Sequence, residues 1–127
     1  MELNLSLPPA VDAPLRARAE VQALNLEGRT REDVTLLVSE LVTNCVVHAD
    51  LVPGQNIDLR LLRRDGRVRV EVFDGGLGFA ATLVHNNEQD EFGTGLGLFI
   101  VETLADRWGV QRGDRTCVWF EVDERQR

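Results

Sequence analysis

Two short apolar–polar alternations joined by a turn signal constrain the fold of this chain more than any other feature. Apolar residues occupy every second position from 57 to 61 and again from 68 to 72, and Asp65-Gly66 lies between them. Asp-Gly at this place is typical of a tight hairpin turn. A period of two sends side chains alternately to the two faces of a sheet, so we expect an antiparallel pair with one buried face. That face needs a second layer to cover it.

Three segments with apolar residues at helical spacing can supply that layer. The longest runs from about 30 to 49, with Thr30 as its expected N-cap and Asp33 close to a capping-box position. Its expected buried face is Val34, Leu37, Val38, Leu41, Val42 and Cys45. A helix from about 12 to 26 would bury Leu15, Ala19, Ala23 and Leu26. A third, from the glycines at 93–97 to about Trp108, would bury Leu96, Phe99, Ile100 and Leu104.

Further strands are expected at both ends of the chain. Leucines alternate with polar residues from 3 to 7, and a last hairpin turns near Gly113-Asp114, with Val118, Phe120 and Val122 facing inward in its second strand. The charged tail 123–127 is expected to fray. Together these elements predict one domain, residues 1–127, with an α+β fold. We expect a two-layer sandwich whose mixed, mostly antiparallel sheet is covered on one face by helices.

Composition excludes some classes of function. The formal net charge is −7 and the basic residues are all arginine, so a general nucleic-acid-binding surface is not expected. No apolar run approaches the ~20 residues of a membrane span, and the N-terminus does not resemble a signal peptide. The two cysteines, Cys45 and Cys117, do not form a close pair. We therefore expect a cytoplasmic protein with reduced thiols.

A narrow polar stripe lies on the long predicted helix. Glu40, Thr43, Asn44 and His48 are spaced so that they share one side of it. The stripe can be an ordinary solvated face. It can also be the edge of a site, in which Asn44 offers the oxygen donor that Mg²⁺ prefers and Glu40 accepts a proton from an attacking hydroxyl.

Two glycine-rich segments follow. Asp74-Gly75-Gly76-Leu77-Gly78 comes directly after a strand, where it reads either as a tight turn or as a carboxylate aimed at a flat ligand that glycines admit. Gly93, Gly95 and Gly97 open a helix, whose N-terminal N–H groups can hold phosphates. Their spacing differs from the dinucleotide fingerprint, and the chain has no lysine for a Walker A loop.

The order of these three features resembles the N box, G1 box and G2 box of the GHKL ATPases, a class that includes histidine kinases and gyrase. The residues that carry the likeness are ELVTNCVVHA at 40–49, DGGLG at 74–78 and GTGLGL at 93–98. The length, the ELVTN of the N box and the ending LADRWG at 104–109 are most similar to the RsbW-like anti-sigma-factor branch.

The resemblance implies a role for each matching residue. Glu40 would be the general base, and Asn44 would hold the Mg²⁺ that bridges the phosphates of ATP. Asp74 would bond the adenine amino group. His48 would lie near the phosphates, although it can equally be a helix C-terminal cation. The implied nucleotide-binding set is Asn44, His48, Asp74, Gly76, Gly78, Gly93, Thr94, Gly95, Leu96 and Gly97, with residues 79–92 as the lid.

Members of this branch are homodimers that sequester a sigma factor and phosphorylate a serine on a STAS-domain anti-sigma antagonist. The resemblance thus implies a protein serine/threonine kinase that uses ATP and Mg²⁺, with strand 3–7 as a candidate dimer element. The lid has no arginine or lysine, unlike many relatives. That favours an alternative, a non-catalytic regulator whose partner-binding surface is shaped by ATP. A detached histidine kinase domain is disfavoured, because the only histidines, His48 and His85, lie in the N box and the lid.

Overall fold

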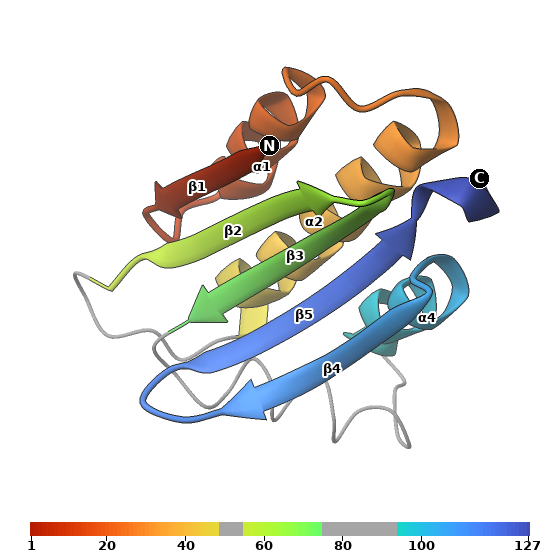
Figure 1. Ribbon diagram of the computed structural model, residues 1–127. Coiled ribbons are helices and arrows are strands. Elements are labelled where there is room, and N and C mark those ends of the chain that lie inside the picture. The colour runs from red at the N-terminus through yellow and green to blue at the C-terminus, as the bar shows by residue number, and fades with distance from the viewer. Residues whose placement is uncertain (49–54, 75–93) are drawn as a thin grey trace.

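The computed structural model describes residues 1–48, 55–74 and 94–127, with only the backbone described at residue 48 and at 94–98. Its strands form one sheet in the order β1-β2-β3-β5-β4, and the three α-helices lie on one face of that sheet (Figure 1). All four strand pairings in the described residues are antiparallel. The predicted α+β two-layer sandwich is confirmed, and its sheet contains no parallel pair among these strands.

Four of the five strands in the described residues lie where apolar alternation predicted them, and β4 begins within the segment predicted to end the third helix. The strands are β1 (Glu2–Leu7), β2 (Ile57–Arg64), β3 (Arg67–Asp74), β4 (Arg107–Arg112) and β5 (Thr116–Asp123). The turn between β2 and β3 has positive φ at both Asp65 and Gly66, 55° and 76°. Positive φ at both positions matches the twist of the flanking strands. The inward residues predicted for β2, β3 and β5 are all buried.

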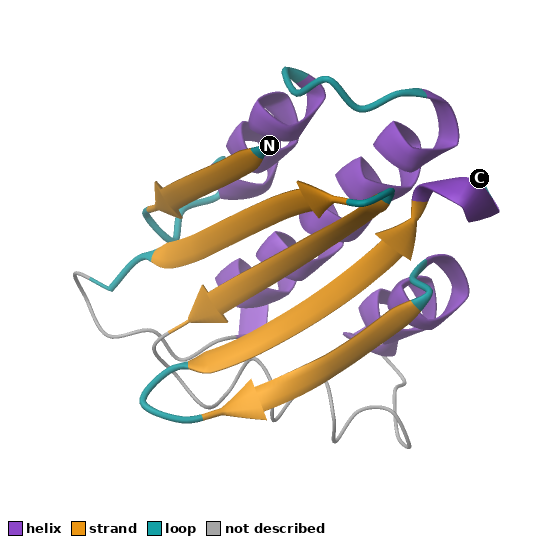
Figure 2. Cartoon of the chain, viewed as in Figure 1, coloured by secondary structure: helices purple, strands orange, loops and turns teal. Residues whose placement is uncertain are grey.

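The helices are α1 (Ala13–Gln22), α2 (Gly28–His48) and α4 (Thr94–Leu104), with a short 3-10 helix, η1 (Glu124–Gln126), at the C-terminal end. Figure 2 shows the three α-helices grouped on one side of the strands. All six residues predicted for the buried face of α2 have no exposed surface. In the described parts of the chain, no helix has the length and apolar character to cross a membrane.

The start of α2 and the packing of α1 differ from expectation. The first helical backbone bond of α2 joins the N–H of Arg31 to the carbonyl of Glu27 at 3.2 Å, so Thr30 lies inside the first turn and is not the N-cap. Leu15 is 59% exposed, and Ala19 and Ala23 are exposed as well. Instead α1 buries Ala13, Ala17 and Val21. Small side chains at this spacing let α1 approach α2 closely, which the larger leucine would prevent.

The third predicted helix also ends earlier than expected. α4 stops at Leu104, and the N–H of Asp106 already donates to the carbonyl of Glu121 at 2.9 Å, which turns the chain into β4. Trp108 therefore lies in a strand. Phe99 is 63% exposed and Val101 is fully buried, while the side chain of Leu96 lies outside the described residues.

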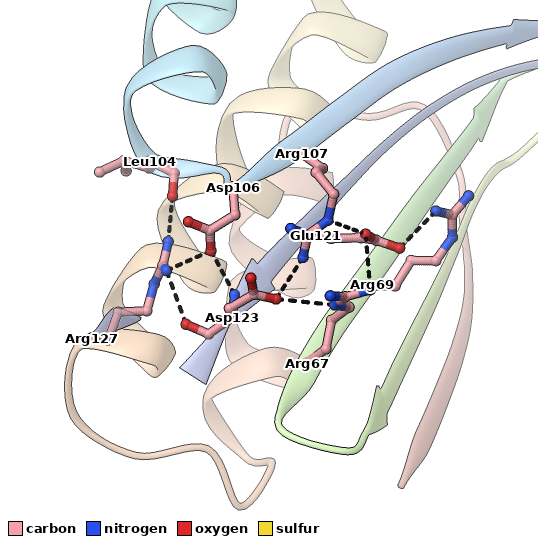
Figure 3. Close-up of polar contacts among 8 residues, drawn as sticks. All are labelled: Arg67, Arg69, Leu104, Asp106, Arg107, Glu121, Asp123 and Arg127. Atoms are coloured by element: carbon pink, nitrogen blue, oxygen red, sulfur yellow. Dashed lines mark hydrogen bonds and ion pairs between the residues drawn. The ribbon is translucent and has the colours of Figure 1, made fainter. Parts of the chain in front are cut away.

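The C-terminal tail is ordered, contrary to the expected fraying. The side chain of Arg127 is only 7% exposed and pairs with Asp33 of α2 at 3.1 Å and with Asp106 at 2.8 Å. It also donates to the carbonyl of Leu104 at the end of α4 (Figure 3). One arginine thus joins the tail to two helices.

The face of the sheet away from the helices carries a network of ion pairs between arginines and carboxylates. Arg69 bonds Glu121 at 3.1 Å, and its guanidinium lies 4.3 Å from the centre of the Trp119 ring. Gly109 on the neighbouring strand leaves room for that ring, because a Cβ there would be 2.9 Å from it. Side chains of neighbouring strands therefore pack against one another on this part of the outer face.

Candidate functional site

Two parts of the predicted site, Asp74 and the last turns of α2 that carry Asn44, lie at one end of the β3–β5 pair. Asp74 is the last residue of β3, and it pairs in register with Thr116, the first residue of β5. The C-terminal end of α2 lies at the same end of the molecule (Figure 1). This end, defined by Asp74, Thr116 and the last turns of α2, is called the site end below.

Asp74 has a side chain that is completely buried beneath the helices. Its negative charge reaches Cys45 of α2. The pKa of that thiol is raised well above its ordinary value, chiefly by burial and then by the charge of Asp74. The Asp74 carboxylate therefore lies close to α2. A ligand bound between the sheet and α2 could contact it.

Two buried polar groups near Asp74 have no hydrogen-bond partner among the described residues. They are the amide nitrogen Nδ2 of Asn44 and the hydroxyl Oγ1 of Thr116, whose residues are 8% and 1% exposed. Burying such groups unpaired is costly, so native proteins nearly always pair them. Both are therefore suited to a polar ligand at the site end. Thr116 was missed from the sequence because it belongs to no motif considered there; its place opposite Asp74 appears only when the strands are paired.

The remaining members of the polar stripe differ from one another. Glu40 is partly buried and lies one turn before Asn44. The hydroxyl of Thr43 donates to the carbonyl of Ser39 at 2.7 Å, so the helix backbone already uses it. His48 ends α2, and its side chain lies outside the described residues.

The predicted phosphate segment is only partly described. Thr94, Gly95, Leu96 and Gly97 form the first turn of α4, a helix of 11 residues that contacts α2. The first N–H groups of such a helix point outward and favour an anion. Gly76, Gly78, Gly93 and the lid segment 79–92 lie outside the described residues.

Candidates for holding a metal are few. Among the side chains of the described residues, no group of three or more His, Cys, Asp and Glu is placed to bind a cation. A magnesium ion at the site end would thus take few ligands from this part of the protein, with Asn44 the candidate. Mg²⁺ commonly binds in this way, completing its shell with waters and phosphate oxygens. The amide oxygen of Asn44 is an oxygen donor that the described residues would offer to such an ion.

Arg115 supports the site end from the outer face of the sheet. It pairs with Asp58 of β2 and donates to the carbonyl of Phe73, the residue before Asp74, at 3.3 Å. Burial raises the pKa of Asp58, but hydrogen bonds from Ser6 and Arg115 outweigh it and hold that pKa below its ordinary value. This arginine was also missed from the sequence, where no motif marks it.

A separate hollow of about 650 Å³ lies between α1 and α2. The exposed Leu15 and Leu36 line it together with Arg18 and Arg31. In the described parts of the chain it contains none of the predicted site residues. It is a second feature of the surface and not part of the site end.

Comparisons with known proteins agree with this arrangement. Residues 7–122 match the family described as the histidine kinase-like ATPase domain. An anti-sigma F factor from Caldanaerobacter subterraneus subsp. tengcongensis is 30% identical over 84 residues, which are 62% of this chain and 59% of that protein. The crystal structure of the RsbU and RsbW domains of Rv1364c from Mycobacterium tuberculosis matches 97% of this chain and 32% of that chain, with a TM-score of 0.72 and 20% identity. The matched region thus spans about three fifths of the first relative and a third of the second. At 20% identity, the likeness to the second is a likeness of fold.

Proposed function

This chain belongs to the histidine kinase-like ATPase domain family, and from that premise we propose that it binds ATP with Mg²⁺ at the site end. The observation that carries the proposal is the group of buried polar side chains there. Asp74 is fully buried, while Asn44 and Thr116 have buried polar atoms without partners in the described residues. A nucleotide offers polar groups at both of its ends, so it can serve all three.

Each residue then has a defined contact. The carboxylate of Asp74 accepts a hydrogen bond from the adenine amino group, with the Thr116 hydroxyl beside it. The amide of Asn44 serves the phosphate end. The backbone N–H groups of the first turn of α4 hold the phosphate oxygens, with the helix dipole favouring their negative charge. A bound Mg²⁺ would neutralise part of the phosphate charge.

We further propose that the protein is an anti-sigma factor with serine kinase activity. Its likeness to an anti-sigma F factor supports this, as does the position of Glu40 one turn from Asn44. The Glu40 carboxylate would take the proton of a serine hydroxyl on a STAS-domain antagonist. The serine oxygen bonds to the γ-phosphorus as the bond to the bridging oxygen of ADP breaks. Glu40 would act by accepting that proton, and a homodimer would form through the free edge of β1.

Glu40→Ala tests the catalytic part of the proposal. With labelled ATP, Mg²⁺ and a STAS-domain antagonist, the unaltered protein should label a serine on the antagonist. Glu40→Ala should lose at least 100-fold in transfer, on the order of one general-base contribution, while ATP affinity is retained. Glu102→Ala, at an exposed position on α4 and outside the hollow between α1 and α2, is the control and should keep full transfer. Unchanged transfer in Glu40→Ala would remove Glu40 from the base role.

A second function is favoured by the hollow between α1 and α2. Its exposed leucines and flanking arginines form a surface separate from the site end, as a protein-binding regulator without catalysis would need. In that case ATP changes partner capture but no phosphoserine forms. Affinity capture from the native cell with and without ATP, followed by phosphoserine detection on the captured proteins, separates the two functions.

A further inference from the structure

Arg115 joins three segments that are far apart in the sequence. It lies in the turn between β4 and β5, directly before Thr116. Its Nη1 pairs with Asp58 at the start of β2, and its Nη2 donates to the carbonyl of Asn56 at 2.9 Å and to that of Phe73 at 3.3 Å. The guanidinium also lies 5.8 Å from the centre of the Phe73 ring. One side chain therefore holds the ends of β2, β3 and β5 together.

The bond to Phe73 bears directly on Asp74. The Phe73 carbonyl and the Asp74 nitrogen belong to the same peptide group, which is planar. Fixing that carbonyl therefore fixes the plane of the Asp74 N–H and restrains the backbone from which the Asp74 side chain departs. Successive side chains of a strand point to opposite faces, so Phe73 meets Arg115 on the outer face while Asp74 enters the buried layer beneath α2.

We propose that Arg115 is a positioning residue, which orients the Asp74 carboxylate for the amino group of adenine. This inference rests on the proposed nucleotide function. Arg115 touches no nucleotide; it acts through the peptide group before Asp74.

Electrostatics and side-chain chemistry support the same assignment. The charges of Asp74 and Arg115 are both felt at the Cys45 thiol, where burial is the larger influence on the pKa, Asp74 raises it and Arg115 lowers it. Both charges therefore lie within electrostatic reach of the same buried thiol. A guanidinium has a planar fork of donors that can serve one carboxylate and two carbonyls at once, and a lysine ammonium cannot match that geometry.

The test compares Arg115→Ala and Arg115→Lys with the unaltered protein. Arg112→Ala is the matched control, because Arg112 is an exposed arginine of the same hairpin. Affinities for ATP, ADP, adenosine and GTP are measured by calorimetry, and melting temperatures are measured in parallel. Arg115→Ala should weaken ATP, ADP and adenosine by the same factor, about tenfold, because the adenine contact is common to all three. Arg115→Lys should lie between, and Arg112→Ala should match the unaltered protein.

Selectivity separates positioning from general loosening. A misdirected carboxylate should reduce the preference for ATP over GTP, which lacks the 6-amino group, whereas general loosening would weaken both equally. If Arg115→Ala does not fold, the selectivity of Arg115→Lys carries the test. Unchanged adenosine affinity and unchanged selectivity in the folded Arg115 variants would overturn the inference while leaving the proposed function standing. Absence of nucleotide binding in the unaltered protein would overturn both.

Discussion

The two ends of the β3–β5 pair treat their polar groups in opposite ways. At one end Arg67 pairs with Asp123, and at the other Asp74 pairs with Thr116. At the first, called the clasped end, Asp123 bonds Arg67 at 3.0 Å and Arg107 as well (Figure 3). At the site end, polar atoms of Asn44 and Thr116 are buried without partners in the described residues.

This difference separates stability from function within one sheet. Polar groups of the clasped end bond one another, so removing one should lower the free energy of unfolding. Polar groups of the site end are suited to a ligand, so removing one should weaken ligand affinity and leave the free energy of unfolding nearly unchanged or raised. Proteins commonly accept such local instability where they bind a ligand.

The largest expected effect is at the clasped end, where Arg127 donates to the carbonyl of Asp123 at 3.1 Å. Arg127→Ala removes a nearly buried cation that pairs with Asp33 and Asp106, leaving both carboxylates without it. The free energy of unfolding should fall by about 3 kcal/mol, the scale of breaking a buried charge pair, while ATP affinity of the folded protein stays unchanged. Denaturant unfolding and calorimetry measure the two quantities. Arg125→Ala, at an exposed position in η1, is the control. A loss below 1 kcal/mol, or a changed ATP affinity, would erase the contrast between the ends.

A smaller effect is expected from acid. Burial raises the pKa of Glu121, but bonds from Arg107 and Arg69 outweigh it and hold the pKa below its ordinary 4.5. Bonds from Arg107 and Arg67 likewise lower the pKa of Asp123 below 3.8. Because the folded pKa values lie below the unfolded ones, this stabilisation is complete above the unfolded values and is lost as pH falls through the folded values.

Denaturant unfolding between pH 7 and pH 2 measures that loss. The free energy of unfolding should begin to fall below about pH 5. Glu121→Gln should show a shallower fall, since one of the titrating carboxyls is gone. An equal slope in the variant would mean that the clasped end does not govern the acid response.

The smallest expected effect has the opposite sign. Thr116→Val replaces a buried hydroxyl that lacks a partner in the described chain, and should raise the free energy of unfolding by about 0.5–1 kcal/mol. Thr43→Val is the matched control. Its hydroxyl bonds Ser39, so this substitution should lower stability by about 1 kcal/mol. If thermal unfolding instead shows Thr116→Val destabilised, the Thr116 hydroxyl has a structural role.

Regular patterns made much of the fold predictable. The buried face of α2 and the hairpin at Asp65-Gly66 follow from periods of 3.6 and 2, which depend on local geometry alone. The face of α1 did not follow, because Leu15 suggested one stripe while close helix packing selected Ala13 and Ala17. A charged tail ending in Arg127 reads as solvated, and only tertiary structure shows the carboxylates that receive it.

The candidate site stays a prediction, but part of its layout followed from the sequence. Residue spacing along α2 and the strand before Asp74 suggested two sides of a site, and the structure places Asn44 and Asp74 at the same end of the molecule. Thr116 and Arg115 could not be found from the sequence, because their contacts are distant along the chain. Thr116 lies opposite Asp74, 42 residues away, and Arg115 bonds the carbonyls of Phe73 and Asn56, 42 and 59 residues away. The roles of Gly76, Gly78 and Gly93 stay predictions, since these glycines lie outside the described residues.

Calorimetric titration of ATP with Mg²⁺ into the unaltered protein and into Asp74→Asn tests the central claim most directly. Asp114→Asn, an exposed carboxylate in the β4–β5 turn, serves as the control. We expect binding to the unaltered protein and to the control. Asp74→Asn should lose ~1–3 kcal/mol of binding free energy, the scale of one buried hydrogen bond to a charged group. Absence of binding in the unaltered protein, or equal affinity in Asp74→Asn, would contradict the proposed nucleotide site.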